Sequence, residues 1–492
     1  MTLHAIVLGI IVLTLLVVSF ARMGKVKTKA DYLVAGRSLP TFVLVFTLLS
    51  SWIGSGSLLA GVENAYQHGF PALWQGAGGW GGLLLIYFIA PRARHFAQFT
   101  IPDLLEARYN QTARILGVVA VLFAYTAIAS YQIVGGGDIL HLIFPQYVTA
   151  DLGKYIIAAF VIVFTAIAGM ASVAYMDLAI GLLATVTLLI ALPVLTHIGG
   201  GWSHIAQTLP ATHFQPLGDF SVLRALELFL PTCMLMLGNQ AMYQKFFSAR
   251  SEKAASHAVV WWFVGTVVLE TAIVALAVVG SSLFPTGEVH EHPRELLAYM
   301  ALHGLTGTPW LSLLGAVMLG AIFAKVVSTA NNFLFSPSTN LINDIFLRYL
   351  APNASNKRTL IVSRLMVVLL GCWALYQSLH IESVLQKALY AYTIYSAALT
   401  PVILAAFYSK RVNAQGAVSA IFAGTITTIC WDLPFVHNSL PAWLAERDAI
   451  FPALIAALVC LVAVSAFTKP PKAEQVAQFF PGVNYAKPKE EG

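Results

Sequence analysis

A lysine inside a long apolar stretch is the residue of this sequence most able to do chemistry. Lys325, Ser328 and Thr329 stand at i, i+3 and i+4, so on a helix their side chains share one face. Lys325 is the only charged residue in 307–343, and a lysine at bilayer depth costs at least ~2.5–3.5 kcal/mol unless it is paired or hydrated. Snorkelling to the interface is the ordinary alternative, but it would be strained from mid-span. We therefore interpret this face as part of a functional site, in which the lysine requires a partner.

A second group of polar residues interrupts another apolar stretch. Residues 50–57 (SSWIGSGS) hold two glycines and four serines, a composition with poor helix propensity. An unwound backbone at bilayer depth is tolerated where its carbonyls face a cavity or bind something. We therefore expect a discontinuous helix that lines a site here, although a packing face of small residues is the simpler alternative.

Other polar side chains in apolar stretches could serve such a site or bond to neighbouring helices. Candidate partners for the lysine are buried charges, namely Asp177, Glu270, Asp138 and the pair Arg224 and Glu227, which could also satisfy each other. Candidates to bind a polar solute are hydroxyl, aromatic and carboxamide residues, namely Ser55, Ser57, Trp74, Gln75, Tyr131, Gln132, Asn239, Gln240 and Tyr392. The sequence leaves both readings of these residues open.

The elements that must position these residues are membrane helices. Of 492 residues, 58% are hydrophobic and 10% charged, whereas soluble proteins carry about 25% charged residues. Runs long enough to span a bilayer, roughly 20 residues each, predict an all-α integral membrane protein with about thirteen helices. The predicted spans are 4–21, 40–66, 74–91, 112–144, 153–175, 176–198, 222–247, 255–284, 307–345, 359–378, 384–408, 415–434 and 450–467. We expect one transmembrane domain, 1–467, and a polar tail, 468–492.

Basic residues alternate between the two sets of loops. One set is rich in lysine and arginine: 22–37, 92–114, 245–253 (which begins with Lys245), 348–358, 410–411 and the tail. The other set holds little beyond Lys154, Arg294 and Arg447. By the positive-inside rule the first set is cytoplasmic. This predicts a multi-pass protein of the cell (inner) membrane, with its N-terminus outside and its C-terminus in the cytoplasm.

Several function classes are not expected. The sequence contains no HExxH, GxSxG or Walker motif and no cluster of cysteine and histidine, so we predict neither an enzyme nor a cofactor. The net charge of +6 is spread over short loops without interleaved aromatics, which argues against nucleic acid as a partner. The expected partners are a small-molecule solute and the lipid bilayer, and the sequence does not indicate an oligomeric state.

Four motifs, in the right order and topology, resemble those of the sodium/solute symporter family over nearly the whole chain. They are residues 31–39 (DYLVAGRSL), 100–109 (TIPDLLEARY), 244–249 (QKFFSA) and 328–344 (STANNFLFSPSTNLIND). The resemblance implies two inverted five-helix repeats, here about 40–198 and 222–408, with flanking helices outside them. It also implies helices that are broken at the midplane and alternating access around a site between the second and seventh spans.

The resemblance further implies a sodium site. In family members the ion is held by backbone carbonyls of the broken second span, which match Ile53 and Gly56 here, and by the ninth span. The ninth-span groups would be the carbonyl of Lys325 and the hydroxyls of Ser328 and Thr329, with Asp177 nearby. This sequence departs from the family at Lys325, because the family commonly has a small residue such as alanine there.

The lysine changes the expected coupling. Its ammonium could reach the space that sodium would fill, and two cations a few ångströms apart would repel strongly. We therefore expect a secondary active transporter of a small polar organic solute whose coupling is to protons or absent. A sodium symporter with ordinary coupling, and a membrane sensor that binds a solute without transporting it, are the alternatives. The sequence does not choose the solute.

Overall fold

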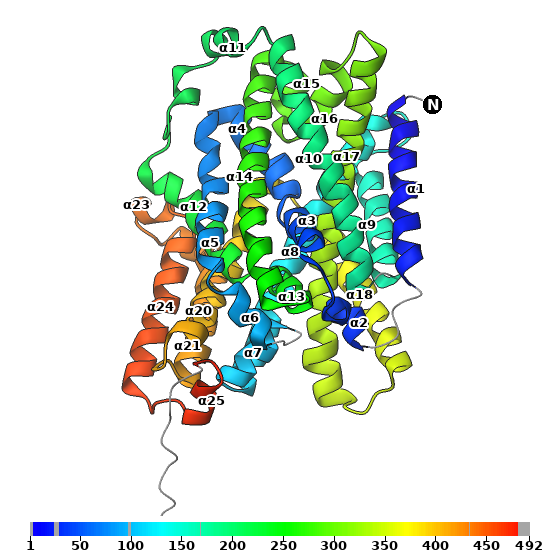
Figure 1. Ribbon diagram of the computed structural model, residues 1–492. Coiled ribbons are helices and arrows are strands. Elements are labelled where there is room, and N and C mark those ends of the chain that lie inside the picture. Colours follow the sequence, from blue (N-terminus) through cyan, green and yellow to red (C-terminus); the bar gives the residue numbers. More distant parts are fainter. Residues whose placement is uncertain (1–2, 24–28, 97–99, 168, 432, 481–492) are drawn as a thin grey trace, which may run out of the picture.

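The computed structural model describes residues 3–23, 29–96, 100–167, 169–431 and 433–480, which form a bundle of helices (Figure 1). No strand occurs in these ranges, where the only bridge joins Leu39 to Ala249. Helices are expected because every backbone N–H and C=O in a bilayer must be satisfied within its own segment. The end of the predicted tail, residues 481–492, lies outside the described residues.

Ten helices in the described ranges are long and apolar enough to cross a membrane, and one bent pair of helices makes eleven. A helix lies in each of the thirteen predicted spans, but two of these helices are shorter than the others. α5 has 14 residues, and the apolar part of α1 is Leu3–Val17. The prediction of an all-α membrane protein is confirmed, and the number of thirteen crossings stays a prediction.

The helices that lie in the thirteen predicted spans, in chain order, are α1 (Leu3–Met23), α3 (Thr41–Trp52) with η2 (Gly56–Ala60) and α4 (Gly61–His68), α5 (Leu73–Ile86), α8 (Gln111–Ile143), α9 (Ala150–Ile167), α10 (Met170–Ile198), α12 (Val222–Gly238) with α13 (Gln240–Ser248), α14 (Glu252–Leu283), α17 (Pro309–Asn340) with η7 (Leu341–Leu350), α18 (Asn356–Ser378), α19 (Val384–Ala398) with α20 (Thr400–Tyr408), α21 (Ala414–Trp431) and α24 (Ile450–Phe467). The short elements between them are α2 (Lys29–Val34), η1 (Ala35–Arg37), η3 (Phe70–Ala72), α6 (Ala90–Phe96), α7 (Ile101–Arg108), α11 (Trp202–Thr208), η4 (Ala211–Phe214), α15 (Glu288–Glu291), η5 (Pro293–Glu295), α16 (Leu296–Tyr299), η6 (Met300–Gly304), α22 (Pro434–His437), α23 (Ala442–Ala445) and α25 (Ala473–Ala477).

Two of the spans are broken near their middle. α3 ends where Ile53 takes an extended conformation (φ −83°, ψ 102°), and the chain resumes as the π-helical η2. The two halves of this span meet at 54°. The other break is at Asn239 (φ −58°, ψ 112°), between α12 and α13. The discontinuity predicted for residues 50–57 is therefore present, and it lies within that segment.

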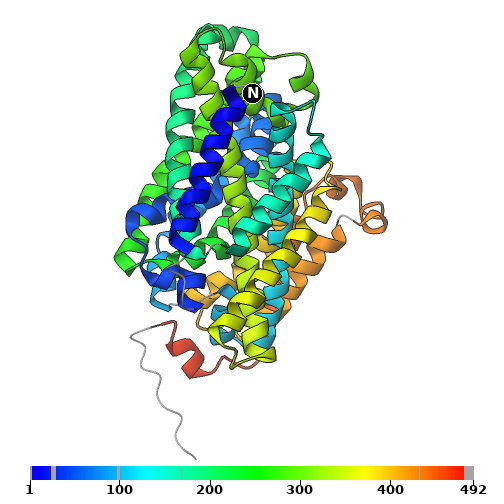
Figure 2. The same cartoon turned by 90° about the vertical axis from the view of Figure 1, so that its right-hand side faces the viewer.

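The helices that carry the candidate residues lie in the interior of the bundle. α17 packs against α8, α10 and α3, whereas α1 covers α10 and α17 from outside (Figure 2). The start of α1 and the short α25 lie at opposite ends of the bundle (Figure 1). That placement requires an odd number of crossings. Which end faces the cytoplasm stays a prediction.

Candidate functional site

Asp177 is the centre of a polar cluster that is closed to solvent. α10 begins at Met170, so Asp177 lies two turns inside the helix and not at its head, as the predicted boundary at 175/176 had placed it. Its side chain is fully buried. Thr47 Oγ1 donates to Oδ2 at 2.6 Å, Asn332 Nδ2 donates to the same oxygen at 3.2 Å, and Ser328 Oγ donates to Oδ1. α3 and α17 thus both hold this carboxylate.

A second lysine, Lys245 of α13, forms the direct ion pair with Asp177. Its Nζ lies 3.6 Å from Asp177 Oδ2 and donates to the carbonyl oxygen of Thr47 at 2.9 Å. The charge pattern predicts a loop at Lys245, which is wrong, because this residue lies on α13 with its side chain about 1% exposed inside the bundle. α13, which follows the break at Asn239, packs against α3 and brings Lys245 to Thr47 and Asp177.

Lys325 lies in the same cluster but reaches Asp177 through an intermediate residue. Its Nζ donates to Ser50 Oγ at 3.0 Å, and Ser50 Oγ donates to the backbone carbonyl of Asp177 at 2.9 Å. In the described part of the chain no carboxylate oxygen lies within 4.0 Å of Lys325 Nζ. We call these eight residues the lysine cluster: Thr47, Ser50, Asp177, Lys245, Lys325, Ser328, Thr329 and Asn332.

Backbone oxygens converge on Thr329 at the break in α3. Thr329 Oγ1 lies 2.9 Å from the carbonyl oxygen of Ser50, 3.3 Å from that of Ile53 and 3.0 Å from that of Lys325. A hydroxyl has one proton to donate, so these oxygens exceed what Thr329 can satisfy. Gly54 permits the approach, since a Cβ there would lie 2.6 Å from Thr329 Cγ2.

The oxygens implied as sodium ligands are only partly brought together. The carbonyls of Ile53 and Lys325 meet at Thr329, whereas Ser328 is turned toward Asp177. The carbonyl of Gly56 instead accepts from the backbone N–H of Gly61 and from Gln75 Nε2, the latter at 3.5 Å.

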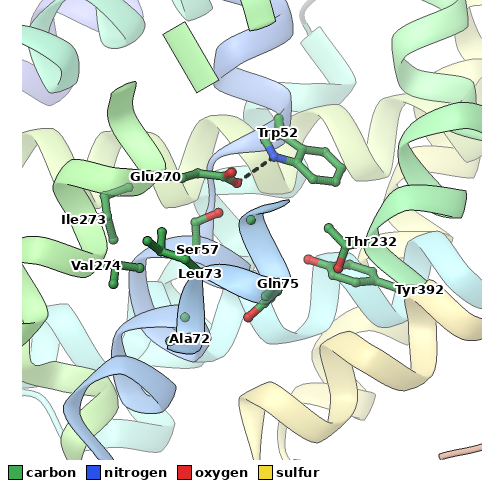
Figure 3. Close-up of a pocket in the computed structure, with 12 residues that line it drawn as sticks. Trp52, Ser57, Ala72, Leu73, Gln75, Thr232, Glu270, Ile273, Val274 and Tyr392 are labelled. Atoms are coloured by element: carbon green, nitrogen blue, oxygen red, sulfur yellow. Dashed lines mark hydrogen bonds between the residues drawn. The ribbon is translucent and has the colours of Figure 1, made fainter. Parts of the chain in front are cut away.

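A small pocket with a cavity volume of about 30 Å³ lies on the other side of the α3 break. We call it the Glu270 pocket, and its lining residues are Trp52, Ser57, Gly61, Ala72, Leu73, Gln75, Gly76, Thr232, Glu270, Ile273, Val274 and Tyr392. Glu270 accepts a hydrogen bond from Trp52 Nε1 at 2.8 Å (Figure 3) and one from Trp80 Nε1 at 2.8 Å. Gly76 allows the carboxylate to lie close against α5, since a Cβ there would stand 2.8 Å from Glu270 Oε2.

Three of the candidate solute-binding residues, Ser57, Gln75 and Tyr392, line the Glu270 pocket. Two others stand directly behind it: Tyr131 OH lies 3.1 Å from Tyr392 OH, and Gln132 Oε1 accepts from the backbone N–H of Ser55 at 2.8 Å. The hydroxyl of Ser55 itself is buried without a partner.

The remaining candidates lie elsewhere. Asn239 accepts from Tyr125 OH at 2.8 Å and caps α13 by accepting from the backbone N–H of Met242. Gln240 bonds to Ser336 at 3.1 Å and to Asn340, and Trp74 Nε1 donates to the carbonyl of Pro216 at 2.9 Å. These three side chains form hydrogen bonds with backbone groups or with side chains of neighbouring helices, and they do not line the pocket.

A network of charges ties α7, α8 and η7 together at one end of the bundle. Arg114 contacts Asp103, Glu106 and Asp344, and Arg348 donates to Glu106 Oε1 at 2.8 Å. Burial alone would raise the pKa of Glu106, but hydrogen bonds and attraction to Arg114 and Arg348 outweigh burial and hold it below its usual range. The charge pattern predicts an ordinary loop charge at Arg114, whereas its side chain is 5% exposed and forms three ion pairs.

Sequence reasoning missed Trp52, Thr232 and Lys245 as members of these two regions and did not place Glu270 in a pocket. The one available signal for Glu270 was its charge in the apolar run 255–284. Lys245 had no comparable signal, because it stands at the edge of a hydrophobic run beside other basic residues. Its position depends on the direction that the chain takes after the break at Asn239.

The chain is similar to known membrane transporters over almost its whole length. The sequence model of the sodium:solute symporter family matches residues 32–424. The osmoregulated proline transporter OpuE of Bacillus subtilis is 25% identical over 486 residues, which cover 94% of each chain. The sodium/proline symporter of Escherichia coli is 24% identical over 488 residues, which cover 94% of this chain and 93% of the symporter.

Solved structures share the fold. A substrate-bound, outward-open sodium-coupled sialic acid symporter superimposes with a TM-score of 0.78 at 17% identity, covering 96% of this chain and 98% of the symporter. MhsT in complex with L-phenylalanine has a TM-score of 0.55 at 16% identity, covering 86% and 98% of the two chains. At these identities the likeness concerns the fold, including its broken helices.

Proposed function

The chain belongs to the sodium:solute symporter family, and from this premise we propose that it carries a small polar organic solute by alternating access with sodium coupling weakened or absent. Membership makes it a multi-pass membrane protein and a secondary active transporter, not an enzyme. The Glu270 pocket is the proposed place of the solute, because it adjoins the break in α3 and lies among α3, α5, α12, α14 and α19. The expected repeats, 40–198 and 222–408, would each begin with one of the two broken spans.

The observation that carries the proposal about coupling is the charge of the lysine cluster. Two lysines lie in a cluster that holds one carboxylate: Lys245 pairs with Asp177 directly, and Lys325 is linked to its backbone through Ser50. Two unit charges 4 Å apart repel by about 4 kcal/mol at an effective dielectric constant of 20. A sodium ion at the oxygens around Thr329 would add a third cation beside the Lys325 ammonium, which binds Ser50, one of the residues that supply those oxygens.

Proton exchange at the lysine cluster is the form of coupling that this arrangement supports best. A lysine ammonium can give up its proton in a protein interior, and a change in its charge would alter the bonds that join α3, α13 and α17. These three elements include both broken spans. A metal ion bound permanently at the oxygens around Thr329 would prevent this proton exchange, because it would repel the Lys325 ammonium from Ser50.

The orientation is part of the proposal. The end of the bundle that carries α2, α6 and α7 is placed in the cytoplasm, because the lysine- and arginine-rich loops lie on these elements (Figure 1). The N-terminus is then outside. Proteolysis or labelling of single cysteines in intact cells at Lys154, on the opposite side, and at Lys472, near the C-terminus, would test this orientation.

Uptake into proteoliposomes with separately imposed sodium and proton gradients tests the function. We expect solute accumulation that does not require sodium and responds to a proton gradient, or exchange without either. Strong stimulation by a sodium gradient in the wild-type protein would overturn the proposal on coupling. Saturable binding with no uptake under any gradient would overturn the proposal of a transporter and favour a sensor.

A further inference from the structure

The only formal charge in the Glu270 pocket is negative. Among the described residues that line it, Glu270 is the single ionisable acid, and no lysine, arginine or histidine joins it there. Its side chain is 94% buried, since the residue is 6% exposed. A carboxylate at this depth is costly unless a cation or several donors compensate it.

Among the described residues, Glu270 has hydrogen-bond donors but no basic partner. One carboxylate oxygen accepts from Trp52 and the other from Trp80, both at 2.8 Å. In the described part of the chain no basic nitrogen lies within 4.0 Å of it. An ionised carboxylate offers about four acceptor positions. The two indoles orient Glu270 at the pocket wall and leave acceptor positions that the protein does not fill.

Gln75 adds a second unfilled acceptor to the same pocket. Its Oε1 atom is buried and has no hydrogen-bond partner, whereas its Nε2 points toward the carbonyl of Gly56 at 3.5 Å. The hydroxyl of Thr232, another lining residue, donates to the carbonyl of Leu228 at 2.9 Å, so toward any other group its oxygen can only accept. The pocket thus has an excess of acceptors, and its missing partner is a group that donates several hydrogen bonds.

Aromatic side chains complete this environment. Trp52 and Tyr392 both line the pocket, and the Trp52 indole donates to Glu270 (Figure 3). Aromatic faces attract cations by about 0.5–2 kcal/mol. A negative charge, free acceptors and aromatic rings in one small pocket all favour a positive ligand, and each of them disfavours a free carboxylate at the same position.

We propose that the Glu270 pocket recognises a solute that bears a positively charged amine, with Glu270 as its counter-ion and Gln75 as a second acceptor. This inference rests on the proposed function only for the statement that a solute enters the pocket. It names the chemical class of the solute, which the lysine cluster does not determine. In the lysine cluster the positive charge comes from the protein's own lysines. In the Glu270 pocket it would come from the amine of the solute.

Matched pairs of small molecules, differing in the charged amine, test the proposal on the full chain in nanodiscs. The pairs are cyclohexylamine against cyclohexanol and proline against cyclopentanecarboxylate, and the readout is saturable thermal stabilisation. We expect the amine-bearing member to bind the wild-type protein at least about tenfold more tightly, as a charge-assisted hydrogen bond implies. This comparison requires no variant to fold.

Two variants assign the preference to Glu270. Glu270→Gln keeps the shape of the side chain, and we expect it to reduce the preference for the amine to less than about twofold. Glu63→Gln is the matched control, because Glu63 lies on α4 outside the pocket lining, and it should keep the wild-type preference. Gln75→Leu should weaken amine binding by a smaller factor than Glu270→Gln does.

The outcomes separate this inference from the proposed function. Equal binding of charged and uncharged members, or an amine preference that survives in Glu270→Gln, would overturn the role of Glu270. Amine-selective binding without any uptake would support Glu270 while rejecting a transporter. Uptake of neutral or anionic solutes with no amine preference would support a transporter while rejecting the role of Glu270.

Discussion

The lysine cluster and the Glu270 pocket flank the same break in α3, yet they carry charges of opposite sign. The cluster joins Lys245 and Lys325 to Asp177 and is closed to solvent. The pocket holds Glu270 with two neutral indole donors and has space beside it. Ser50 and Trp52, two residues apart on α3, belong to one region each.

The difference shows where the protein supplies its own counter-charge and where it does not. In the lysine cluster each charged group has partners from α3, α10, α13 or α17. In the Glu270 pocket the described chain supplies donors for two acceptor positions and leaves Gln75 Oε1 unsatisfied. A built-in cation competes with an incoming one, whereas an uncompensated carboxylate attracts one.

The largest effect is expected when the carboxylate of the lysine cluster is removed. Asp177→Asn leaves two buried lysines without an anion, and breaking a buried ion pair costs about 3–5 kcal/mol. We expect a large fall in melting temperature and in the yield of folded protein. Asp151→Asn is the control, because Asp151 is 70% exposed and pairs with Lys154 on the surface, where pairs contribute about 0–1 kcal/mol. Equal melting of the two variants would contradict the central role of Asp177.

The two lysines should differ from each other. Lys245→Met breaks the direct ion pair at 3.6 Å, so we expect it to cost about 3 kcal/mol. Lys325→Met removes the ammonium that has no carboxylate oxygen within 4.0 Å in the described chain, and we expect a smaller loss or a gain in stability. Thermal melting of both variants in the same detergent measures the difference. A greater loss for Lys325→Met would show that Lys325 is the main partner of Asp177.

Two glycines at the break in α3 separate the regions more finely. A Cβ at Gly54 would lie 2.6 Å from Thr329 Cγ2, and one at Gly56 would meet the hydroxyl of Tyr392. Overpacking typically costs about 1–3 kcal/mol. Gly54→Ala should therefore lower stability through the lysine cluster, whereas Gly56→Ala should weaken solute binding more than it lowers the melting temperature. The same ratio of the two effects in both variants would argue that the regions are not separate.

Sequence reasoning predicted the elements well because bilayer physics acts on local runs. The length of the apolar runs predicted where the long helices lie, and the glycines and serines of 50–57 predicted the break in α3. The family motifs gave the fold. Lys325 was found because a charge within an apolar run is conspicuous on its own.

The site was harder to predict, because its geometry depends on contacts between distant helices. Lys245 enters the cluster through the packing of α13 against α3 and its ion pair with Asp177 on α10. Gln240 and Trp74 have the chemistry of binding residues, but their polar atoms bond to Asn340 and to the carbonyl of Pro216. A polar residue in a membrane span can serve a solute or a neighbouring helix, and one sequence does not distinguish these roles.

Sodium binding by the purified wild-type protein, beside Lys325→Ala and Lys325→Met, tests the central claim most directly. Melting temperatures are compared in NaCl and KCl at equal ionic strength. The account predicts no sodium-specific stabilisation of the wild type, a sodium-specific increase in Lys325→Ala, where space and oxygens are freed, and none in Lys325→Met, whose side chain fills that space. Saturable, sodium-specific stabilisation of the wild-type protein would contradict the claim that Lys325 excludes the ion.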